Sequence, residues 1–509
     1  MGSLWLDTRN AQPHPGTRAI EVPSAAEVLI VGAGITGLVC GLECARAGLE
    51  VTVLDRHGVA GLTTGKTTAK ATCLQGARIS EIARSHGTDG AREYVAINQA
   101  ALQWLRDFCA RAGVPVQERA AYSIAQSRST LPALHREAEA ARAAGLDVGW
   151  GQGAPLDYVP FPIAGFVGLE GQAQCDPVEL SIALAEEIIS LGGTIIEGIT
   201  VRGVTATGAT RVRTSHGEIA ADRVVLATGT PILDRGGFFA KLEAERSYLA
   251  AFPLAADALS PEGMYVSIDR PDVAPPRSLR SAPGYLLVGG NGHVTGRAKD
   301  TQARVRDLTE WTAQHFPALS PSHQWSAQDY RSIDGLPLVG PLLPRSTPIL
   351  IASGYAKWGM TNGVAAGRIL AARLTSTTAP GMELFDSQRS LVARRLPGFL
   401  SQNAQVGAAV AKALPRLARL RTSPPKEGEG VVHWHRLRPV ASSTVDGSTS
   451  TVSAICPHLK GLLAWNPAER TWDCPLHGSR FEPDGALIEG PATRDLTPCQ
   501  SLEWKGSRS

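Results

Sequence analysis

A glycine-rich turn near the N-terminus limits the possible folds of this chain more than any other segment. An apolar run at residues 28–31 leads into Gly-Ala-Gly-Ile-Thr-Gly, a helical stretch follows, and a second apolar run ends at Asp55. Glycines in such a turn let backbone N–H groups approach a pyrophosphate at a helix N-terminus, and the acid accepts a hydrogen bond from a ribose hydroxyl. The order of these parts predicts an α/β, Rossmann-like domain with a dinucleotide site formed by Gly32, Gly34, Ile35, Thr36, Gly37 and Asp55.

Two later segments indicate which dinucleotide binds. Residues 222–230 predict an apolar strand ending in Ala-Thr-Gly, and residues 348–374 predict a strand, a glycine-bearing turn and a helix. The second segment would place backbone N–H groups and a helix N-terminus where a flavin ring can sit. The sequence holds no second fingerprint with its own acid, so it predicts FAD rather than a separate NAD(P)H domain.

Much of the chain, from about residue 25 to residue 375, resembles the glycine oxidase/D-amino acid oxidase family of FAD-dependent oxidoreductases. The matching motifs are spread along the sequence, which makes them more specific than a lone fingerprint. Beside the fingerprint, they lie at residues 175–201, 226–230, 333–341 and 353–363. The resemblance implies an inserted antiparallel sheet for substrate binding, built from parts of residues 90–175 and from residues 243–330.

The resemblance also implies which later residues hold FAD. In this family the stretch around Val201 contacts the adenine end, the segment at residues 61–70 lies near the isoalloxazine, and the closing motif holds the pyrimidine side of the flavin. Transferred to this sequence, the implied FAD contacts beyond the fingerprint are Arg56, Thr63, Thr64, Thr67, Thr68, Val201, Thr228, Gly229, Asp334, Gly354, Gly359, Met360 and Thr361.

The catalytic residues are less well indicated. Members of this family that bind a carboxylate place an arginine five residues before the Asp-Gly of the 333–341 motif, and this chain has Asp329 there, with Arg331 nearby. A carboxylate at that position would favour a cationic amine as substrate, although Asp329 could equally be a surface or capping residue. His293 is a candidate base, and the alternative is a polar turn residue after a strand.

Two pairs of metal-ligand residues occur near the C-terminus, Cys456-Pro-His458 and Cys474-Pro-Leu-His477, with fifteen residues between them. Two thiolates and two imidazoles suit either tetrahedral Zn²⁺ or an iron–sulfur cluster. Because each loop supplies one Cys and one His, the pattern favours a cluster in which one iron takes both thiolates and the other takes both imidazoles. The loops resemble those of Rieske domains, which implies a small all-β domain with a [2Fe–2S] cluster.

Two departures from the Rieske proteins of cytochrome bc complexes have consequences. Gly461 and Leu476 stand where those proteins carry a disulfide between the two loops. Ser479 matches a serine that donates a hydrogen bond to a bridging sulfur, whereas Phe481 replaces a tyrosine that donates another. Hydrogen bonds to cluster sulfurs raise the reduction potential, so we expect a potential in the lower half of the Rieske range.

The remaining segments complete the expected domain order. We expect an N-terminal extension at 1–24, a helical segment and linker at 376–430, and the Rieske domain at 431–509. Residues 405–421 are amphipathic, which fits either packing against the flavin domain or contact with a membrane.

The net charge of +3 gives no reason to expect a nucleic-acid partner. With neither a signal peptide nor an apolar run that could span a bilayer, the sequence predicts a cytoplasmic protein without an integral membrane segment.

The two cofactors together indicate the kind of reaction. FAD takes two electrons from an organic substrate, whereas a [2Fe–2S] cluster carries one electron at a time. We therefore expect an enzyme, an FAD-dependent dehydrogenase that oxidises a small amine or amino acid and passes the electrons through the cluster to an external acceptor. The alternatives are a flavoenzyme with the reverse electron flow, fed by a ferredoxin-type donor in a biosynthetic pathway, and a non-enzymatic redox sensor.

Overall fold

The computed structural model describes residues 2–9, 22–156, 159–206, 208–255, 261–316, 320–344, 348–390, 423–435 and 438–499. The amphipathic segment predicted at 405–421 lies outside these residues. Among the described helices, none has the length and apolarity that a bilayer crossing requires.

The first of two large sheets contains the predicted dinucleotide fold. Its five central strands, in the order β17-β10-β1-β2-β7, are parallel, and their apolar residues are buried on both faces, as expected for a sheet covered on both sides. The eight strands are β1 (Ala25–Val31), β2 (Val51–Asp55), β7 (Thr194–Glu197), β8 (Val201–Thr205), β9 (Arg211–Thr214), β10 (Gly217–Leu226), β16 (Leu338–Pro341) and β17 (Ile349–Ser353).

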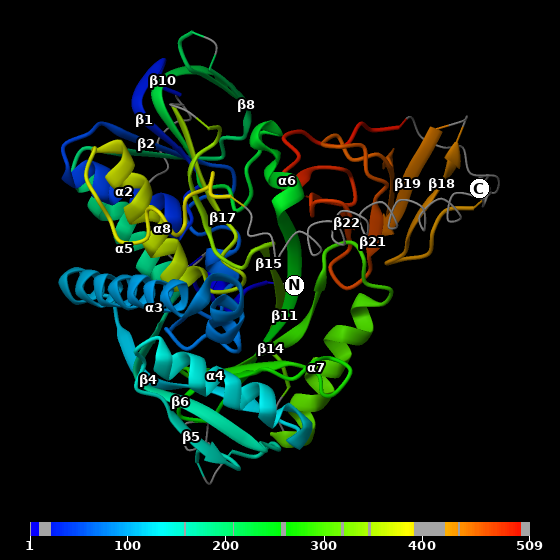
Figure 1. The fold of residues 1–509 in the computed structure, drawn as a ribbon. Coiled ribbons are helices and arrows are strands. Elements are labelled where there is room, and N and C mark those ends of the chain that lie inside the picture. The colour runs from blue at the N-terminus through cyan, green and yellow to red at the C-terminus, as the bar shows by residue number, and fades with distance from the viewer. Residues whose placement is uncertain are drawn as a thin grey trace.

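Helices α2 (Ile35–Arg46), α5 (Pro177–Ser190) and α8 (Gly359–Leu374) pack together against the first sheet (Figure 1). Small residues allow α2 and α8 to approach closely, since a Cβ at Gly367 would lie 2.8 Å from the carbonyl oxygen of Thr36. The other helices are α1 (Leu4–Arg9), α3 (Arg78–Ala112), α4 (Leu131–Ala143), α6 (Phe238–Lys241) and α7 (Thr301–His315), with short 3₁₀ turns at Thr64–Lys66, Arg128–Thr130 and Arg235–Gly237.

The second sheet has nine strands, and all of its pairs are antiparallel except β4 with β12. The order along its main path is β15-β11-β14-β13-β12-β4-β6-β3, and β5 pairs with β6. These strands are β3 (Lys70–Ala71), β4 (Val116–Ala125), β5 (Gly149–Gln152), β6 (Gly165–Cys175), β11 (Leu242–Pro253), β12 (Met264–Ser267), β13 (Arg277–Ala282), β14 (Tyr285–Val294) and β15 (His323–Ser332).

The C-terminal part forms two small antiparallel sheets that lie beside β11, β15 and α7 (Figure 1). The first sheet has three strands and the second has four. They are β18 (Gly430–His435), β19 (Arg438–Val445) and β20 (Ser448–Ser453), followed by β21 (Ala464–Asn466), β22 (Thr471–Asp473), β23 (Arg480–Phe481) and β24 (Leu487–Glu489). The predicted fold class, an α/β domain with an inserted sheet and a small all-β domain, is confirmed.

Candidate cofactor sites

A cavity of about 800 Å³ lies between the carboxyl ends of the parallel strands and one face of the second sheet. This is where open α/β sheets bind dinucleotides, and the volume falls in the ordinary range for ligand pockets. Most of the residues predicted to hold FAD meet on its wall. They are Gly32, Gly34, Ile35, Thr36, Asp55, Arg56, Thr63, Thr64, Thr67, Thr68, Val201, Thr228, Gly229, Gly359 and Met360.

Two of the fingerprint glycines, Gly32 and Gly37, have no room for a side chain. At Gly37 a Cβ would lie 1.9 Å from the carbonyl oxygen of Gly32, where helix α2 crosses the end of β1. Gly32 itself has a φ of 113° and lies against the backbone of Ala227. The turn therefore approaches its neighbours as closely as a pyrophosphate-binding loop requires, and the residues present fit FAD.

Asp55 lies at the end of β2 and holds the loop that follows the strand. Its carboxylate accepts hydrogen bonds from the backbone N–H groups of Ala33 (2.8 Å) and His57 (2.7 Å). Burial raises the pKa of Asp55, while these backbone hydrogen bonds act in the opposite direction. The same carboxylate faces the cavity, so it can fix the fingerprint turn and still meet a ribose hydroxyl.

Four predicted FAD residues, Gly37, Gly354, Thr361 and Asp334, do not line the cavity. The hydroxyl of Thr361 is buried and donates to Asn98 Oδ1 at 2.6 Å. Asp334 is buried in a bidentate ion pair with Arg389, with both N–O distances 2.7 Å. Gly354 has a φ of 86° and lies against Ser332. These residues shape the segments behind the cavity wall, and their direct contact with FAD stays a prediction.

The three candidate catalytic residues, His293, Asp329 and Arg331, all line the same cavity. Asp329 accepts hydrogen bonds from the backbone N–H groups of Tyr330 and Lys357, and burial raises its pKa to about 6. Arg331 is partly exposed and lies 3.2 Å from a carboxylate oxygen of Glu81. The backbone bonds to Asp329 show a local capping role in addition to its place on the cavity wall.

His293 is fixed by hydrogen bonds at both ring nitrogens. Nε2 lies 3.1 Å from the hydroxyl of Tyr248, and Nδ1 lies 3.0 Å from the carbonyl oxygen of Val294. Burial lowers the pKa of His293 and so favours the neutral ring. With Nδ1 donating to Val294 and Nε2 accepting from Tyr248, the ring has no free lone pair for a substrate proton.

Several ionisable residues of the cavity wall were not predicted, and Lys70 and Glu245 are two of them. Lys70 is 5% exposed, its Nζ lies 2.5 Å from Ser278 Oγ, and burial lowers its pKa well below the usual value. Burial acts to raise the pKa of Glu245, but Lys357, 3.3 Å away, and Arg331 lower it on balance. Lys70 is the last residue of the segment at 61–70, which lies near the isoalloxazine in this family. This position in the sequence could have identified Lys70 as a residue of the site.

The four predicted cluster ligands meet at the tips of two loops of the C-terminal domain. The thiols of Cys456 and Cys474 are buried within hydrogen-bonding reach of each other, which lowers the pKa of Cys456 and raises that of Cys474. The rings of His458 and His477 are perpendicular, with centroids 5.1 Å apart. In the described structure both Nδ1 atoms are buried without a hydrogen-bond partner, as atoms reserved for a metal would be.

These ligands come as two pairs rather than as one set around a point. In the part of the chain that the structure describes, no three His, Cys, Asp or Glu side chains gather into a group that could hold a single ion. One thiolate pair and one imidazole pair match the two irons of a Rieske cluster. The residues present therefore fit a [2Fe–2S] cluster.

The residues around the ligands differ from a disulfide-linked Rieske site. A Cβ at Gly461 would lie 2.7 Å from Leu476 Cγ and 2.9 Å from Cys474 Sγ, so Gly461 and Leu476 fill the space between the loops. The Ser479 hydroxyl accepts from the backbone N–H of Ala492 at 3.0 Å and lies beside Cys456. Phe481 is fully buried and offers no hydroxyl to the cluster.

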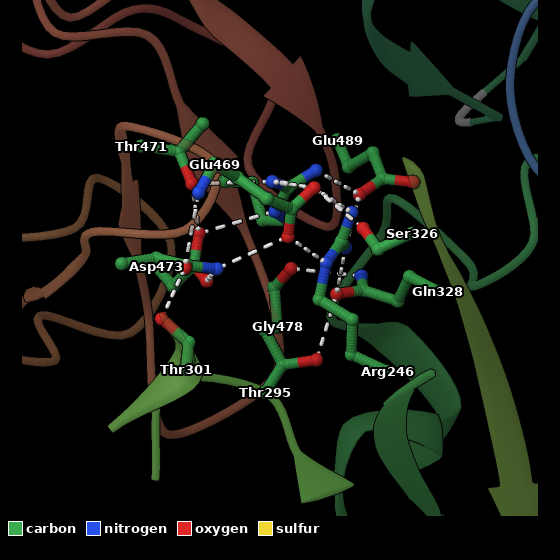
Figure 2. Close-up of polar contacts among 12 residues, drawn as sticks. Arg246, Thr295, Thr301, Ser326, Gln328, Glu469, Thr471, Asp473, Gly478 and Glu489 are labelled. Atoms are coloured by element: carbon green, nitrogen blue, oxygen red, sulfur yellow. Dashed lines mark hydrogen bonds and ion pairs between the residues drawn. The ribbon is translucent and has the colours of Figure 1, made fainter. Parts of the chain in front are cut away.

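A buried network of charged residues joins the C-terminal domain to strands β11 and β15 (Figure 2). Arg246 of β11 is fully buried, and its guanidinium forms ion pairs with Glu469 (2.5 Å) and Glu489 (3.1 Å). Arg480 lies beside it and contacts the same two carboxylates and Asp473 at 3.0 to 3.1 Å. Two cations thus bind three anions in a largely buried position, which holds the domains in one arrangement.

The C-terminal domain also forms part of the FAD cavity wall. Ile488, Glu489 and Gly490 line the cavity. Arg56, directly after Asp55 of the fingerprint unit, donates to the carbonyl oxygen of Ile488 at 3.3 Å. Tyr330 of β15 donates to the carbonyl oxygen of Gly490, also at 3.3 Å. The two predicted sites are therefore parts of one continuous structure.

Comparison with known proteins supports both parts of this structure. Residues 27–373 match the family model for FAD dependent oxidoreductase, DAO, and residues 427–500 match the Rieske [2Fe-2S] domain. The protein YhfW of Bacillus subtilis (strain 168), named as a Rieske 2Fe-2S iron-sulfur protein, is 29% identical over 489 residues, which cover 95% of each chain. Iron-sulfur subunit 3 of the cytochrome b6-f complex of a Nostoc species is 49% identical over 41 residues, 8% of this chain and 23% of that one.

Solved structures show the same fold. Glycine oxidase from Geobacillus kaustophilus superposes with a TM-score of 0.61 at 19% identity, covering 72% of this chain and all of that one. L-amino acid deaminase from Proteus myxofaciens gives a TM-score of 0.58 at 17% identity over 73% and 96% of the two chains. The chain is an oxidoreductase that binds FAD and a [2Fe–2S] cluster. It belongs to the DAO family of FAD-dependent oxidoreductases and carries a C-terminal Rieske domain.

Proposed function

We propose that this protein is a dehydrogenase that oxidises a small amine or amino acid and passes the electrons through its own Rieske cluster to an external acceptor. When bound, FAD supplies the two-electron chemistry and the cluster supplies one-electron transfer. The chain supplies the cavity, the charges that orient the substrate, and a fixed arrangement of the two domains.

One observation carries this proposal: the Rieske domain and the FAD cavity share a wall. Strands β11 and β15 have one face on the cavity and the other on the Rieske domain. On β15, Asp329 lines the cavity, whereas Gln328 donates to the carbonyl oxygen of Gly478 at 2.9 Å, next to the ligand His477. A separate electron carrier would have to diffuse to the flavin, but here the cluster domain is already held against its site.

The charges in the cavity support an amine substrate. Glu245 keeps its negative charge, because Lys357 and Arg331 lower its pKa. Asp329 lies opposite Glu245 in the strand pairing, and the charge of Glu245 acts to raise the pKa of Asp329. An ammonium group bound near both would be attracted by them, and Arg331 or Lys357 could bind a substrate carboxylate. The same wall can therefore hold an amine or a zwitterionic amino acid.

Lys70 is the best-placed residue to accept a proton from the substrate. Burial and the nearby Arg280 lower its pKa well below the usual value, which favours the neutral amine, and its Nζ donates to the hydroxyls of Ser278 and Thr68, at 2.5 and 3.3 Å. A neutral amine keeps a lone pair, whereas both nitrogens of His293 are already engaged. We assign to Lys70 the removal of the proton that an ammonium substrate must lose before hydride transfer.

The experiment is anaerobic mixing of the holoprotein with amines, amino acids and hydroxy acids, followed by flavin absorbance. We expect bleaching by members of the first two classes and none by hydroxy acids. Asp329→Asn should slow bleaching by the active substrate, and Asp89→Asn, at an exposed position of helix α3 outside the cavity wall, should leave it unchanged. Bleaching by hydroxy acids alone would refute the substrate class. If no compound bleaches the flavin but a reduced ferredoxin does, the electrons flow in the reverse direction.

A further inference from the structure

The flavin domain contributes a carboxylate to the surroundings of the cluster. Asp234 lies between β10 and α6, outside the Rieske domain, and its Oδ1 is hydrogen-bonded to Nε2 of His458. The side chain of His458 is 6% exposed and that of Asp234 is 53% exposed. This contact joins two residues that are 224 positions apart in the sequence.

The geometry leaves the other nitrogen of His458 for iron. Nδ1 of His458 is buried and without a partner in the described structure, while Nε2 points to the Asp234 carboxylate. Phe239 of α6 packs against both ligand rings, with centroids 5.4 Å from His477 and 6.4 Å from His458. The flavin domain thus holds the imidazole edge of the site with one carboxylate and one aromatic ring.

We propose that Asp234 is a positioning residue for the Rieske cluster, which orients His458 across the domain boundary and lowers the reduction potential of the cluster. The inference rests on the assignment of His458 as a cluster ligand, which the proposed function also requires. It does not depend on which substrate reduces the flavin. Its consequence is that docking of the flavin domain, and not the Rieske sequence alone, sets the potential.

Two physical effects both lower the reduction potential of the cluster. Reduction adds one electron to the cluster, and a carboxylate hydrogen-bonded to a ligand opposes the added negative charge. A histidine whose second N–H is held by a carboxylate is also a more basic ligand, which stabilises the oxidised metal. Solvent around the half-exposed Asp234 reduces the first effect without changing its sign.

The test is an EPR-monitored redox titration of the full-length protein and of Asp234→Asn, which keeps an oxygen acceptor but loses the charge. We expect the equilibrium to shift about tenfold toward the reduced cluster, which for one electron corresponds to about 59 mV upward. Asp89→Asn is the matched control, since Asp89 is 95% exposed on α3, across the molecule from the Rieske domain (Figure 1). Its midpoint should equal that of the parent protein.

A second variant and an iron assay separate the possible failures. Asp234→Ala, which removes charge and acceptor, should also raise the midpoint and should alter the EPR g values, because the ring of His458 loses its partner. Unchanged midpoints in both Asp234 variants, with full iron content, would overturn this inference alone. Iron retained in Cys474→Ser would instead refute the ligand assignment on which it rests.

Discussion

On strand β15, neighbouring side chains serve different sites. Ala327, Asp329 and Arg331 line the FAD cavity, whereas Gln328 bonds to the Rieske domain, and Tyr330 does both. Charges on the cavity face are partly accessible, so a ligand can still bind them. On the opposite face of β11, Arg246 is fully buried and already paired with Glu469 and Glu489. The difference shows that one sheet can keep an open binding surface on one side and a closed domain interface on the other.

The largest effect is expected when the cluster is removed without any change to the cavity, because the two sites should then respond differently. In Cys474→Ser we expect loss of nearly all iron, because a hydroxyl is a poor ligand in place of a thiolate, with full FAD content. Cys499→Ser is the matched control, a cysteine of the same domain outside the ligand loops. Iron and flavin analysis of the purified proteins checks this. Full iron in Cys474→Ser would show that the cluster has other ligands.

The second prediction concerns the buried face itself. Arg246→Met should destabilise the Rieske domain by about 3–5 kcal/mol, since two buried carboxylates lose one of their two cations and keep only Arg480. The measurement is urea unfolding followed by the cluster's visible absorbance. Glu245→Gln, the neighbouring residue on the cavity face, should cost far less. Equal losses in the two variants would mean that the faces are not energetically distinct.

The third prediction concerns FAD binding in the cavity. Asp55→Ala should weaken FAD binding by roughly 1.5–3 kcal/mol, through loss of a charge-assisted hydrogen bond, and should leave the iron content unchanged. Titration of the apoprotein with FAD measures this. An unaltered FAD affinity would show that the Asp55 carboxylate serves only the backbone of Ala33 and His57.

The smallest effect is expected from mild acid. Burial acts to raise the pKa of Glu489, but Arg246 and Arg480 lower it on balance, from the usual 4.5 to about 2. A carboxylate with a lowered folded-state pKa stabilises the docked state above pH 4.5 and loses this contribution as the pH falls from 4.5 toward 2. Small-angle X-ray scattering should therefore give the same radius of gyration at pH 7 and pH 5, with expansion beginning only below 4.5. Expansion already at pH 5 would contradict the buried network.

Local patterns allowed much of the structure to be predicted. The fingerprint unit spans about thirty residues whose strand, turn, helix and acid follow one another directly, so their relative positions are set by short-range geometry. The two Cys–His motifs are equally local, because each ligand pair lies on one tight loop. In both cases the chemistry depends on residues close together in the sequence.

The shared wall could not be predicted, because it depends on distant pairings. Arg246 and Glu469 are 223 residues apart, and the sequence of β15 carries polar residues on both faces, so its alternation does not show which face is buried. The sequence predicted a linker before the Rieske domain, but not where that domain packs. Asp334 was assigned to FAD by its motif, and its ion pair with Arg389 became evident only in three dimensions.

The most direct test of the central claim follows both cofactors during one reduction. The full-length holoprotein is mixed anaerobically with an active substrate and frozen at increasing times for absorbance and EPR. If electrons pass from the flavin to the cluster across β11 and β15, the signal of the reduced cluster should grow as the flavin bleaches, without any added carrier. A flavin that bleaches completely while the cluster stays oxidised, although dithionite reduces that same cluster, would contradict the account.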